Sequence, residues 1–456
     1  MSKKELGKEE VAEDVSLEKT EEIEPVQQVK VQKKLPTRVW VTYILMFIAI
    51  IGIVTFAVAF MMGYRLSLTG EIERTGLIQV ASSPSGANIV VNGNQMGVRT
   101  RARFSLSEGE HWIEVRRDGF DTWQGHYTVK MNDILWLDYV LLFPLRMRPV
   151  ADATFELTPI QTLNSNRLLA KDADEVLYSV DFSGGNNYRV QRLNFTMESL
   201  QELIDITVAR NGEATEEGGA EEKDEIKLER IVATHNDNNF WVQGSNNTVF
   251  LYTANSRRLT LIGVTNRVMM EAEFNYRDLV FVAQNTQNNR YEVFFYQIGD
   301  ATPTYWRAFD EKPKMAMASY DNVNYLALEF GEQTIIYYSS RGRFFENAER
   351  LTTIEDTGNL SFSPSGRFLR VGDKNYDIEN DVFYEEISAN HWFNGHIMSF
   401  MREDKFFVKD FDGQNEREVA IEPVSLDYVF ISDNNRRLYY FDVENRLIFV
   451  DLQGVE

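Results

Sequence analysis

The sequence has no cysteine among its 456 residues. This absence excludes disulfide bonds, thiolate metal ligands and cysteine nucleophiles. A folded domain outside the cytoplasm must therefore be stabilised by its hydrophobic core, and a few hundred residues suffice to form one. Proline and glycine are also few, with 10 and 27 residues, so the chain is not of low complexity.

Histidine is scarce, and the common catalytic motifs are missing. The five histidines are His111, His126, His235, His391 and His396. No H-E-x-x-H, G-x-S-x-G, G-x-G-x-x-G or G-x-x-x-x-G-K-[ST] pattern occurs, so a zinc-protease site, an α/β-hydrolase nucleophile and a nucleotide-binding site have no support. Glycosidases use a pair of carboxylates, and carboxylates are plentiful here, so a glycosidase remains an open alternative although no particular pair stands out. We assign no catalytic residue, no cofactor-binding residue and no metal ligand, and we expect the protein not to be an enzyme.

Positive charge is in deficit. The chain holds 47 Lys and Arg against 69 Asp and Glu, which gives a net charge of −22. Residues 1–38 are nearly neutral and residues 39–64 carry no charge, so the rest carries about −21. A surface of this sign repels phosphate backbones, and we therefore expect no nucleic-acid partner.

One long apolar run, Val39 to Met62, interrupts the polar chain. As a helix its 24 residues would reach roughly 36 Å, enough to cross a hydrocarbon core of about 30 Å with some tilt. Trp40 and Tyr43 lie near one end and Tyr64 at the other, where such rings favour the headgroup level. The run predicts a transmembrane helix over residues 38–64.

The charges around the run predict its orientation. Four basic residues precede it closely: Lys30, Lys33, Lys34 and Arg38. The positive-inside rule then places residues 1–37 in the cytoplasm, as a disordered polar tail, and the bulk of the chain outside. The alternative is a cleaved signal peptide, but the A-x-A pattern Ala57-Val58-Ala59 lies inside the apolar run.

Small residues recur every fourth position in this helix, at Thr55, Ala59 and Gly63. Such a stripe allows two helices to approach closely, so a homodimer through the membrane helix is a further hypothesis.

Residues 76–145 follow a linker at 65–75 and predict a small β domain. Leu77–Val80 is a strand, Pro84-Ser85-Gly86 a turn, and Asn92-Gly93 a tight hairpin turn. Ile113 and Val115 alternate with polar residues in a later strand, whose inner face they mark.

This order of strands and turns resembles the PEGA domain of bacterial envelope proteins. The residues that carry the resemblance as structural motif positions are Pro84, Gly86, Ala87, Asn92, Gly93, Gly97, Gly109 and Gly119. The sequence departs from the family pattern at Ser85, where Glu is usual, and at Arg101, where Pro is usual. The resemblance implies an extracytoplasmic β module that contacts carbohydrate or protein and carries no catalytic residue. The absence of cysteine also fits a bacterial envelope.

Residues 150–456 read as many short strands in a weak repeat of about 30–45 residues. Copies begin near Thr162, Ile231, Glu273, Ala318, Leu360, His391 and Tyr428. A unit of about four strands that cannot bury both faces alone predicts a β-propeller, with seven blades favoured and six or eight as alternatives. A pair of β-sandwiches remains another all-β alternative.

The clearest copy, around Ser363, Pro364 and Gly366, resembles blade turns of WD40-like and TolB-like propellers. It has Ser365 where Asp is usual, and the resemblance implies a fold without naming a function. Three other segments stand out. Residues 211–224 predict a disordered acidic insertion, Met197–Val208 a short helix, and Asp410-Phe411-Asp412-Gly413 a hairpin turn rather than a calcium loop.

The expected fold is therefore mainly β: one transmembrane helix, a PEGA-like domain and a seven-bladed propeller. The expected function is a single-pass, membrane-anchored extracytoplasmic protein of the bacterial cell envelope that binds a cell-wall polymer or an envelope protein. One alternative is a propeller-type glycan hydrolase or lyase. A second alternative is an envelope sensor whose short tail has a cytoplasmic partner.

Overall fold

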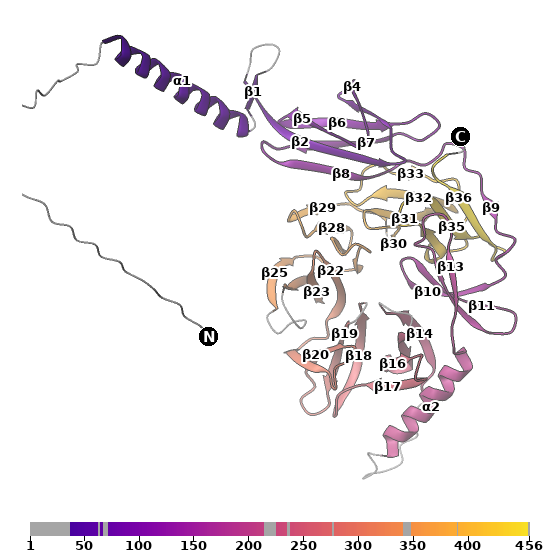
Figure 1. Cartoon of the computed structure of the whole chain (residues 1–456). Helices are drawn as coiled ribbons and strands as arrows, with labels where there is room; N and C mark the ends of the chain where they lie inside the picture. The colour runs from indigo at the N-terminus through magenta and orange to yellow at the C-terminus, as the bar shows by residue number, and fades with distance from the viewer. Residues whose placement is uncertain are drawn as a thin grey trace, which may run out of the picture. The chain divides into compact units, whose positions relative to one another are not determined.

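The computed structural model describes residues 37–62, 64–66, 72–213, 225–234, 238–275, 278–340, 348–389 and 391–454 (Figure 1). It divides into two compact units, Met1–Met62 and Gly63–Glu456, and each is described by itself. The predicted cytoplasmic tail, residues 1–37, lies outside the described residues except at its last position.

The first unit contains α1 (Thr37–Met61), a helix of 25 residues. From Val39 onward the helix has no charged side chain. By its length and composition, the helix is long and apolar enough to cross a bilayer. Thr55 and Ala59 of the small-residue stripe lie on α1, whereas Gly63 lies outside the described residues. An N-terminal helix that fits a single-pass anchor is therefore present.

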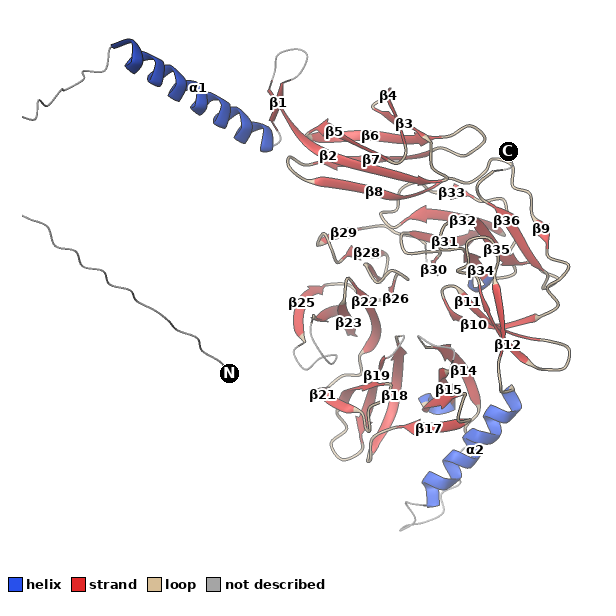
Figure 2. Ribbon diagram, in the orientation of Figure 1, coloured by secondary structure: helices blue, strands red, loops and turns tan. Residues whose placement is uncertain are grey.

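The second unit begins with a β-sandwich over residues 64–143, which we call the sandwich (Figure 2). Its strands are β1 (Tyr64–Leu66), β2 (Ile72–Ser83), β3 (Asn88–Val91), β4 (Asn94–Arg99), β5 (Ala102–Ser107), β6 (Gly109–Arg116), β7 (Trp123–Val129) and β8 (Ile134–Leu141). One sheet has the order β1-β2-β5, with β8 parallel to β2, and the other has the order β4-β3-β6-β7. Ile78, Ile113 and Val115 are fully buried between them.

Local turn chemistry explains why the sandwich forms. Asn92 and Gly93 have φ of 50° and 79°, the left-handed conformation that the predicted tight turn needs. Thr100 is buried and its hydroxyl accepts from the backbone N–H of Ala87 at 3.0 Å, which fixes the β2–β3 connection. His111 bonds to the Asn92 side chain and to a backbone carbonyl, so its role here is structural.

The rest of the second unit is a ring of seven four-stranded sheets, which we call the ring. Its blades are β10 (Thr158–Asn164), β11 (Arg167–Lys171), β12 (Leu177–Asp181), β13 (Arg189–Arg192); β14 (Leu228–Ala233), β15 (Asn239–Gly244), β16 (Val249–Thr253), β17 (Arg258–Ile262); β18 (Arg267–Phe274), β19 (Asp278–Asn285), β20 (Tyr291–Gln297), β21 (Thr304–Phe309); β22 (Lys314–Tyr320), β23 (Val323–Phe330), β24 (Gln333–Ser339), β25 (Glu349–Ile354); β26 (Leu360–Phe362), β27 (Phe368–Val371), β28 (Lys374–Asp377), β29 (Val382–Tyr384); β30 (His391–Trp392), β31 (Ile397–Arg402), β32 (Lys405–Asp410), β33 (Arg417–Glu418); and β34 (Val429–Ile431), β35 (Arg437–Phe441), β36 (Leu447–Asp451) with β9 (Val150–Ala151). Two short 3-10 helices, η1 (Ser245–Asn247) and η2 (Leu426–Tyr428), lie in connections.

The ring is closed by strands from its two ends. β9, the first strand after the sandwich, pairs antiparallel with β36 and completes the seventh blade. A cluster of buried apolar residues fills each junction between neighbouring blades, including the one between the seventh and the first. The expected fold class, a mainly β protein with a seven-bladed propeller, is confirmed.

Both faces of the second strand in a blade are buried, which explains the continuous apolar runs. Leu168 packs toward the seventh blade, whereas Leu169 packs toward the second. Trp241 packs toward the third blade, while its neighbours on β15 pack toward the first. Successive side chains of a strand point to opposite faces, so each blade contributes to two clusters.

The helix predicted at 197–208 is α2 (Met197–Glu213), an insertion between the first two blades. Leu200 and Ile204, one helical turn apart, are fully buried in the cluster that these blades share. The helix continues through residues 211–213, where the sequence predicts a disordered loop, because its buried face anchors the turns before them. Residues 214–224 of that predicted loop lie outside the described residues.

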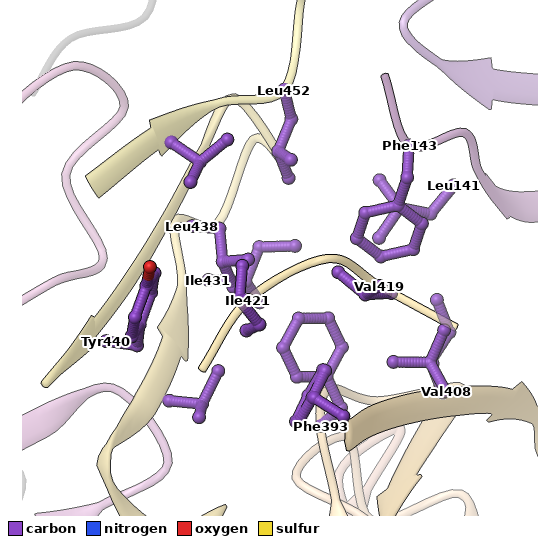
Figure 3. Packing of buried hydrophobic residues seen from close by; sticks show 14 of the residues in the cluster. Leu141, Phe143, Phe393, Val408, Val419, Ile421, Ile431, Leu438, Tyr440 and Leu452 are labelled. Atoms are coloured by element: carbon purple, nitrogen blue, oxygen red, sulfur yellow. The ribbon is translucent and has the colours of Figure 1, made fainter. Parts of the chain in front are cut away.

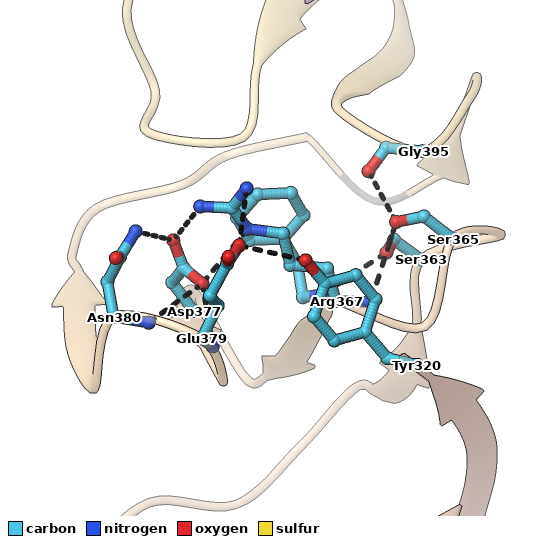
Figure 4. A network of polar contacts seen from close by, with 9 residues as sticks. Tyr320, Ser363, Ser365, Arg367, Asp377, Glu379, Asn380 and Gly395 are labelled. Atoms are coloured by element: carbon cyan, nitrogen blue, oxygen red, sulfur yellow. Dashed lines mark hydrogen bonds and ion pairs between the residues drawn. The ribbon is translucent and has the colours of Figure 1, made fainter. Parts of the chain in front are cut away.

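The predicted blade turn at 363–366 connects β26 to β27 (Figure 4). The Ser363 hydroxyl accepts from the Phe368 N–H at 3.2 Å, and Ser365 donates to the carbonyl of Gly395 in the next blade at 3.1 Å. A Cβ at Gly366 would lie 2.3 Å from the Ser319 carbonyl oxygen of the preceding blade. The turn therefore joins three blades, which accounts for its small residues.

A bidentate ion pair supports this turn. The Arg367 guanidinium donates to both carboxylate oxygens of the buried Asp377, at 3.1 and 2.8 Å (Figure 4). It also contacts Glu379, which accepts from the Tyr320 hydroxyl of the fourth blade at 2.8 Å. All of these contacts are with side chains of the fourth and fifth blades, so we assign this network a structural role.

Candidate binding site at the junction of the sandwich and the ring

The turn between β32 and β33 meets the sandwich. Residues Asp410–Gly413 form the predicted hairpin turn, in which the Gly413 N–H donates to the Asp410 carbonyl at 3.0 Å. The carboxylate of Asp412 accepts from the Gln414 N–H at 3.0 Å and closes the turn further. The turn presents its carboxylates to β7 of the sandwich, and the Phe411 ring packs edge-on against Tyr139 of β8.

Gln414 pairs with the free edge of β7. Its side-chain oxygen accepts from the His126 N–H at 2.8 Å, and its side-chain NH₂ donates to the His126 carbonyl at 3.1 Å. β7 is the last strand of its sheet, so its outer edge otherwise presents unpaired backbone groups. The amide of Gln414 thus takes the place of a neighbouring strand.

Two carboxylates of the turn are buried against aromatic side chains of the sandwich. The indole N–H of the fully buried Trp123 donates to Asp410 at 2.7 Å. The Tyr127 hydroxyl donates to Asp412 at 3.4 Å and lies 3.2 Å from the Tyr139 hydroxyl. These contacts give the buried carboxylates neutral donors.

Burial changes the titration of this cluster. It raises the pKa of Asp410 to about 7, helped by the nearby Asp412 and opposed by the positive charge of Arg417. Burial raises the pKa of Asp412 as well, against hydrogen bonds from Gln414. The pKa of His396, which stacks on Tyr139 with a centroid distance of 5.3 Å, falls to about 4 because it is buried beside Arg367.

Arg417 joins the sandwich to the sixth blade. It contacts Asp121 at 3.2 Å, donates to the Leu141 carbonyl at 2.7 Å, and lies over the Phe143 ring. Leu141 and Phe143 themselves enter the apolar cluster between the sixth and seventh blades, as Figure 3 shows. The sandwich is therefore attached through both polar and apolar contacts.

A groove of about 310 Å³ lies beside this attachment. Its lining comes from the sandwich and from the β32–β33 connection, and consists of Trp112, Asp121, Thr122, Gln124, Gln414, Asn415, Glu416 and Arg417. One aromatic ring, three side-chain amides and three charged groups meet there. Clefts between domains with a few convergent polar groups are frequent ligand sites, so this groove is the candidate binding site.

The first strands of the blades surround the middle of the ring (Figure 2) and carry a second cluster of charges. Burial raises the pKa of Glu273 on β18 to about 7, with Arg230 on β14 opposing the rise and Glu271 adding to it. Glu271 also contacts Lys312 at 3.3 Å. Within the described part of the chain, no group of three or more His, Asp or Glu is arranged to hold a metal ion.

The structure places the predicted motif residues in the turns and strands of the sandwich and the fifth blade. None of Pro84, Gly86, Ala87, Asn92, Gly93, Gly97, Gly109 and Gly119 lines the groove, and neither do Ser363, Pro364 and Gly366. Sequence reasoning missed Trp112, Gln124 and Gln414. The alternation of Ile113 and Val115 was the available signal, because it already places Trp112 on the outer face of its strand.

Comparison with known proteins identifies part of the chain. The model of the PEGA domain matches residues 75–142, the sandwich. No curated protein matches the chain in sequence. Among solved structures, a mitotic checkpoint complex aligns at TM-score 0.38 and 10% identity, over 67% of this chain and 95% of that one. An oligogalacturonate lyase in complex with manganese aligns at TM-score 0.41 and 10% identity, over 68% and 96%. These two similarities are too low to support an argument about function.

Proposed function

We propose that this protein is a membrane-anchored binding and structural protein of the bacterial cell envelope. In this proposal α1 holds the chain in the membrane with residues 1–37 in the cytoplasm. The sandwich and the ring stand outside and contact a cell-wall polymer or an envelope protein. The PEGA match over residues 75–142 and the apolar α1 support the location.

The observation that carries the proposal is the junction between the sandwich and the ring. Across it, the buried Trp123 donates to Asp410, and Gln414 bonds to the backbone at the edge of β7. Phe143 of the sandwich packs among apolar residues of the ring. Holding two domains in one orientation costs conformational freedom, and it preorganises any surface that both domains form. The groove at the junction is such a surface.

The test is co-sedimentation of the purified full-length chain, in detergent, with cell-wall material from the source organism. We expect saturable binding that an excess of soluble wall fragments competes away. An unrelated single-pass protein of similar net charge, in the same detergent, serves as the control. If the chain stays in the supernatant at every wall concentration, the wall-binding form of the proposal is wrong and crosslinking to envelope proteins in intact cells replaces it.

A second candidate function is a glycan hydrolase or lyase, and Glu273 is the observation that favours it. A carboxyl whose pKa lies near 7 is poised for general acid or base catalysis at neutral pH. Release of reducing or unsaturated sugar ends from wall material by the wild type, and its loss in Glu273→Gln, would support this candidate. Equal release by both proteins would exclude Glu273 as the catalytic group, and no release by either would remove this candidate function.

A further inference from the structure

We propose that the groove beside the β32–β33 turn is a binding site for an uncharged oligosaccharide, with Trp112 as its aromatic platform. This inference rests on the proposed function, because it names the class of envelope polymer that the chain would bind. Three properties of the groove support it: the residue types that line it, the hydrogen bonds that hold those side chains in place, and the pairing of its charges.

The aromatic platform is held in place by its own sheet. Trp112 lies on β6 between the buried residues His111 and Ile113, so its side chain points to the opposite, outer face. Its indole N–H donates to Glu114 at 3.0 Å, and its ring lies 4.4 Å from that of His126, at 58°. A sugar ring presents a face of C–H groups, which packs against the electron-rich face of such an indole.

The amides of the groove supply the hydroxyl-binding part. Gln414 is fixed by its two bonds to the His126 backbone and by a third, in which its NH₂ group donates to Asp412 at 3.1 Å, so its side-chain oxygen is the part left to bind a hydroxyl. Asn415 lies against Asp410 and the Trp123 indole. Gln124 projects from the exposed face of β7. The exposed amide of Gln124 offers both donors and an acceptor, which matches the donors and acceptors of sugar hydroxyl and N-acetyl groups.

The charges of the groove cancel within the protein. Arg417 pairs with Asp121 at 3.2 Å, and Glu416 pairs with Lys409 at 3.1 Å and with Arg402 at 2.8 Å. The chain as a whole carries −22, which opposes the approach of a polyanionic polymer. An uncharged sugar chain is therefore the fitting occupant. A volume of about 310 Å³ is at the lower end of ligand pockets, suited to one or two sugar rings.

The experiment is isothermal titration calorimetry of the full-length chain with tetra-N-acetylchitotetraose and, separately, cellotetraose, both of which are uncharged. The detergent must be free of sugar, for example lauryldimethylamine oxide. We expect saturable one-to-one binding of at least one tetrasaccharide. Trp112→Ala should weaken it by about tenfold or more through loss of the platform. Gln124→Ala, an exposed change that spares the fold, should weaken it by roughly three- to tenfold.

Trp136→Ala is the matched control. Trp136 is 45% exposed on β8, on the outer face of the other sheet of the sandwich, so its loss should leave the affinity unchanged. Thermal melting of each variant separates unfolding from loss of the site, and Gln124→Ala keeps the test valid if Trp112→Ala unfolds. The proposal is overturned if neither tetrasaccharide binds the wild type, or if both groove variants bind as tightly as it does.

The same variants distinguish this inference from the function on which it rests. Wild-type co-sedimentation with wall material that Trp112→Ala and Gln124→Ala retain in full would overturn the groove and leave the envelope-binding function standing. No co-sedimentation by the wild type would instead reject the wall-binding function itself.

Discussion

At the scale of single residues, Asp410 links the junction to pH. Its carboxyl is 1% exposed, and its pKa of about 7 lies above the usual value of 3.8 because the buried site disfavours its charged form. A raised folded-state pKa of an acid means that the fold is most stable when the acid is protonated. The resulting loss of stability develops as pH rises from about 4 to about 7 and then stays constant.

Asp410→Asn should remove the contribution of Asp410 to this pH dependence, while that of the neighbouring Asp412 remains. The variant keeps an oxygen that accepts from Trp123 but has no charge to bury, so its Tm relative to the wild type should increase from pH 4 to pH 7. The difference in free energy of unfolding between the two proteins should reach the order of a few kcal/mol by about pH 7 and then level off. Melting curves between pH 4 and pH 9 measure it.

The control for this prediction is Asp404→Asn, which changes an exposed aspartate of the preceding β31–β32 turn. It should follow the wild-type melting profile at every pH. A Tm difference for Asp410→Asn that is constant with pH, or that is larger in acid, would show that the Asp410 carboxylate is not disfavoured at the junction.

Residue chemistry also marks where sequence reasoning ends. Asn92-Gly93 predicts its turn because the required φ angles are a property of those two residues. Gln414 gives no comparable signal, because its partner His126 is 288 residues away and any exposed turn tolerates a glutamine. The carboxylates of Asp410 and Asp412 likewise read as an ordinary hairpin turn, which they form, while their burial depends on a different domain.

At the scale of elements, the anchor helix makes a prediction about topology. The lack of cysteine allows single cysteines to be introduced without removing any other. Ser16→Cys labels the N-terminal tail, and Val443→Cys labels a ring position that is 79% exposed. A membrane-impermeant maleimide applied to intact spheroplasts should react with Val443→Cys only, because the basic residues before α1 hold the tail inside.

Lysed spheroplasts provide the control, since both cysteines should then react. Reaction of Ser16→Cys alone in intact spheroplasts would invert the proposed topology. Loss of the tail from the mature protein would instead support the cleaved signal peptide.

The second helix tests how far an amphipathic pattern explains an insertion. Ile204 is fully buried between the first two blades, whereas Ile206, on the same helix, is 47% exposed. Ile204→Ala should therefore lower stability by about 2–5 kcal/mol, and Ile206→Ala by less than about 1 kcal/mol. Denaturant unfolding of both variants compares the same substitution in two environments, and equal losses would mean that α2 is not packed as described.

At the scale of the whole molecule, the ring was predictable because the same burial pattern repeats in each blade. Every blade buries both faces of its second strand, as Leu168 and Leu169 do, so the same apolar pattern recurs at intervals and its copies can be counted. The attachment of the sandwich does not repeat. Leu141 and Phe143 look like the end of one more β-strand in sequence, and only the fold places them in the cluster between two blades.

This attachment predicts that the sandwich and the ring unfold together. Phe143 is 3% exposed and belongs to the sandwich, whereas Phe393 is 5% exposed in the same cluster but belongs to the sixth blade (Figure 3). Either change to alanine removes a buried ring and should cost about 3–5 kcal/mol. Only Phe143→Ala removes a contact that joins the two domains.

Scanning calorimetry of the full-length chain in detergent distinguishes the two effects. The wild type and Phe393→Ala should each show one transition outside the membrane helix, with a lower Tm in the variant. Phe143→Ala should show two, because the sandwich has its own core around Ile78 and Ile113 and melts separately once its attachment is weakened. One shared transition in all three proteins, with equal losses in Tm for the two variants, would mean that Arg417 and the buried turn suffice to couple the domains without Phe143.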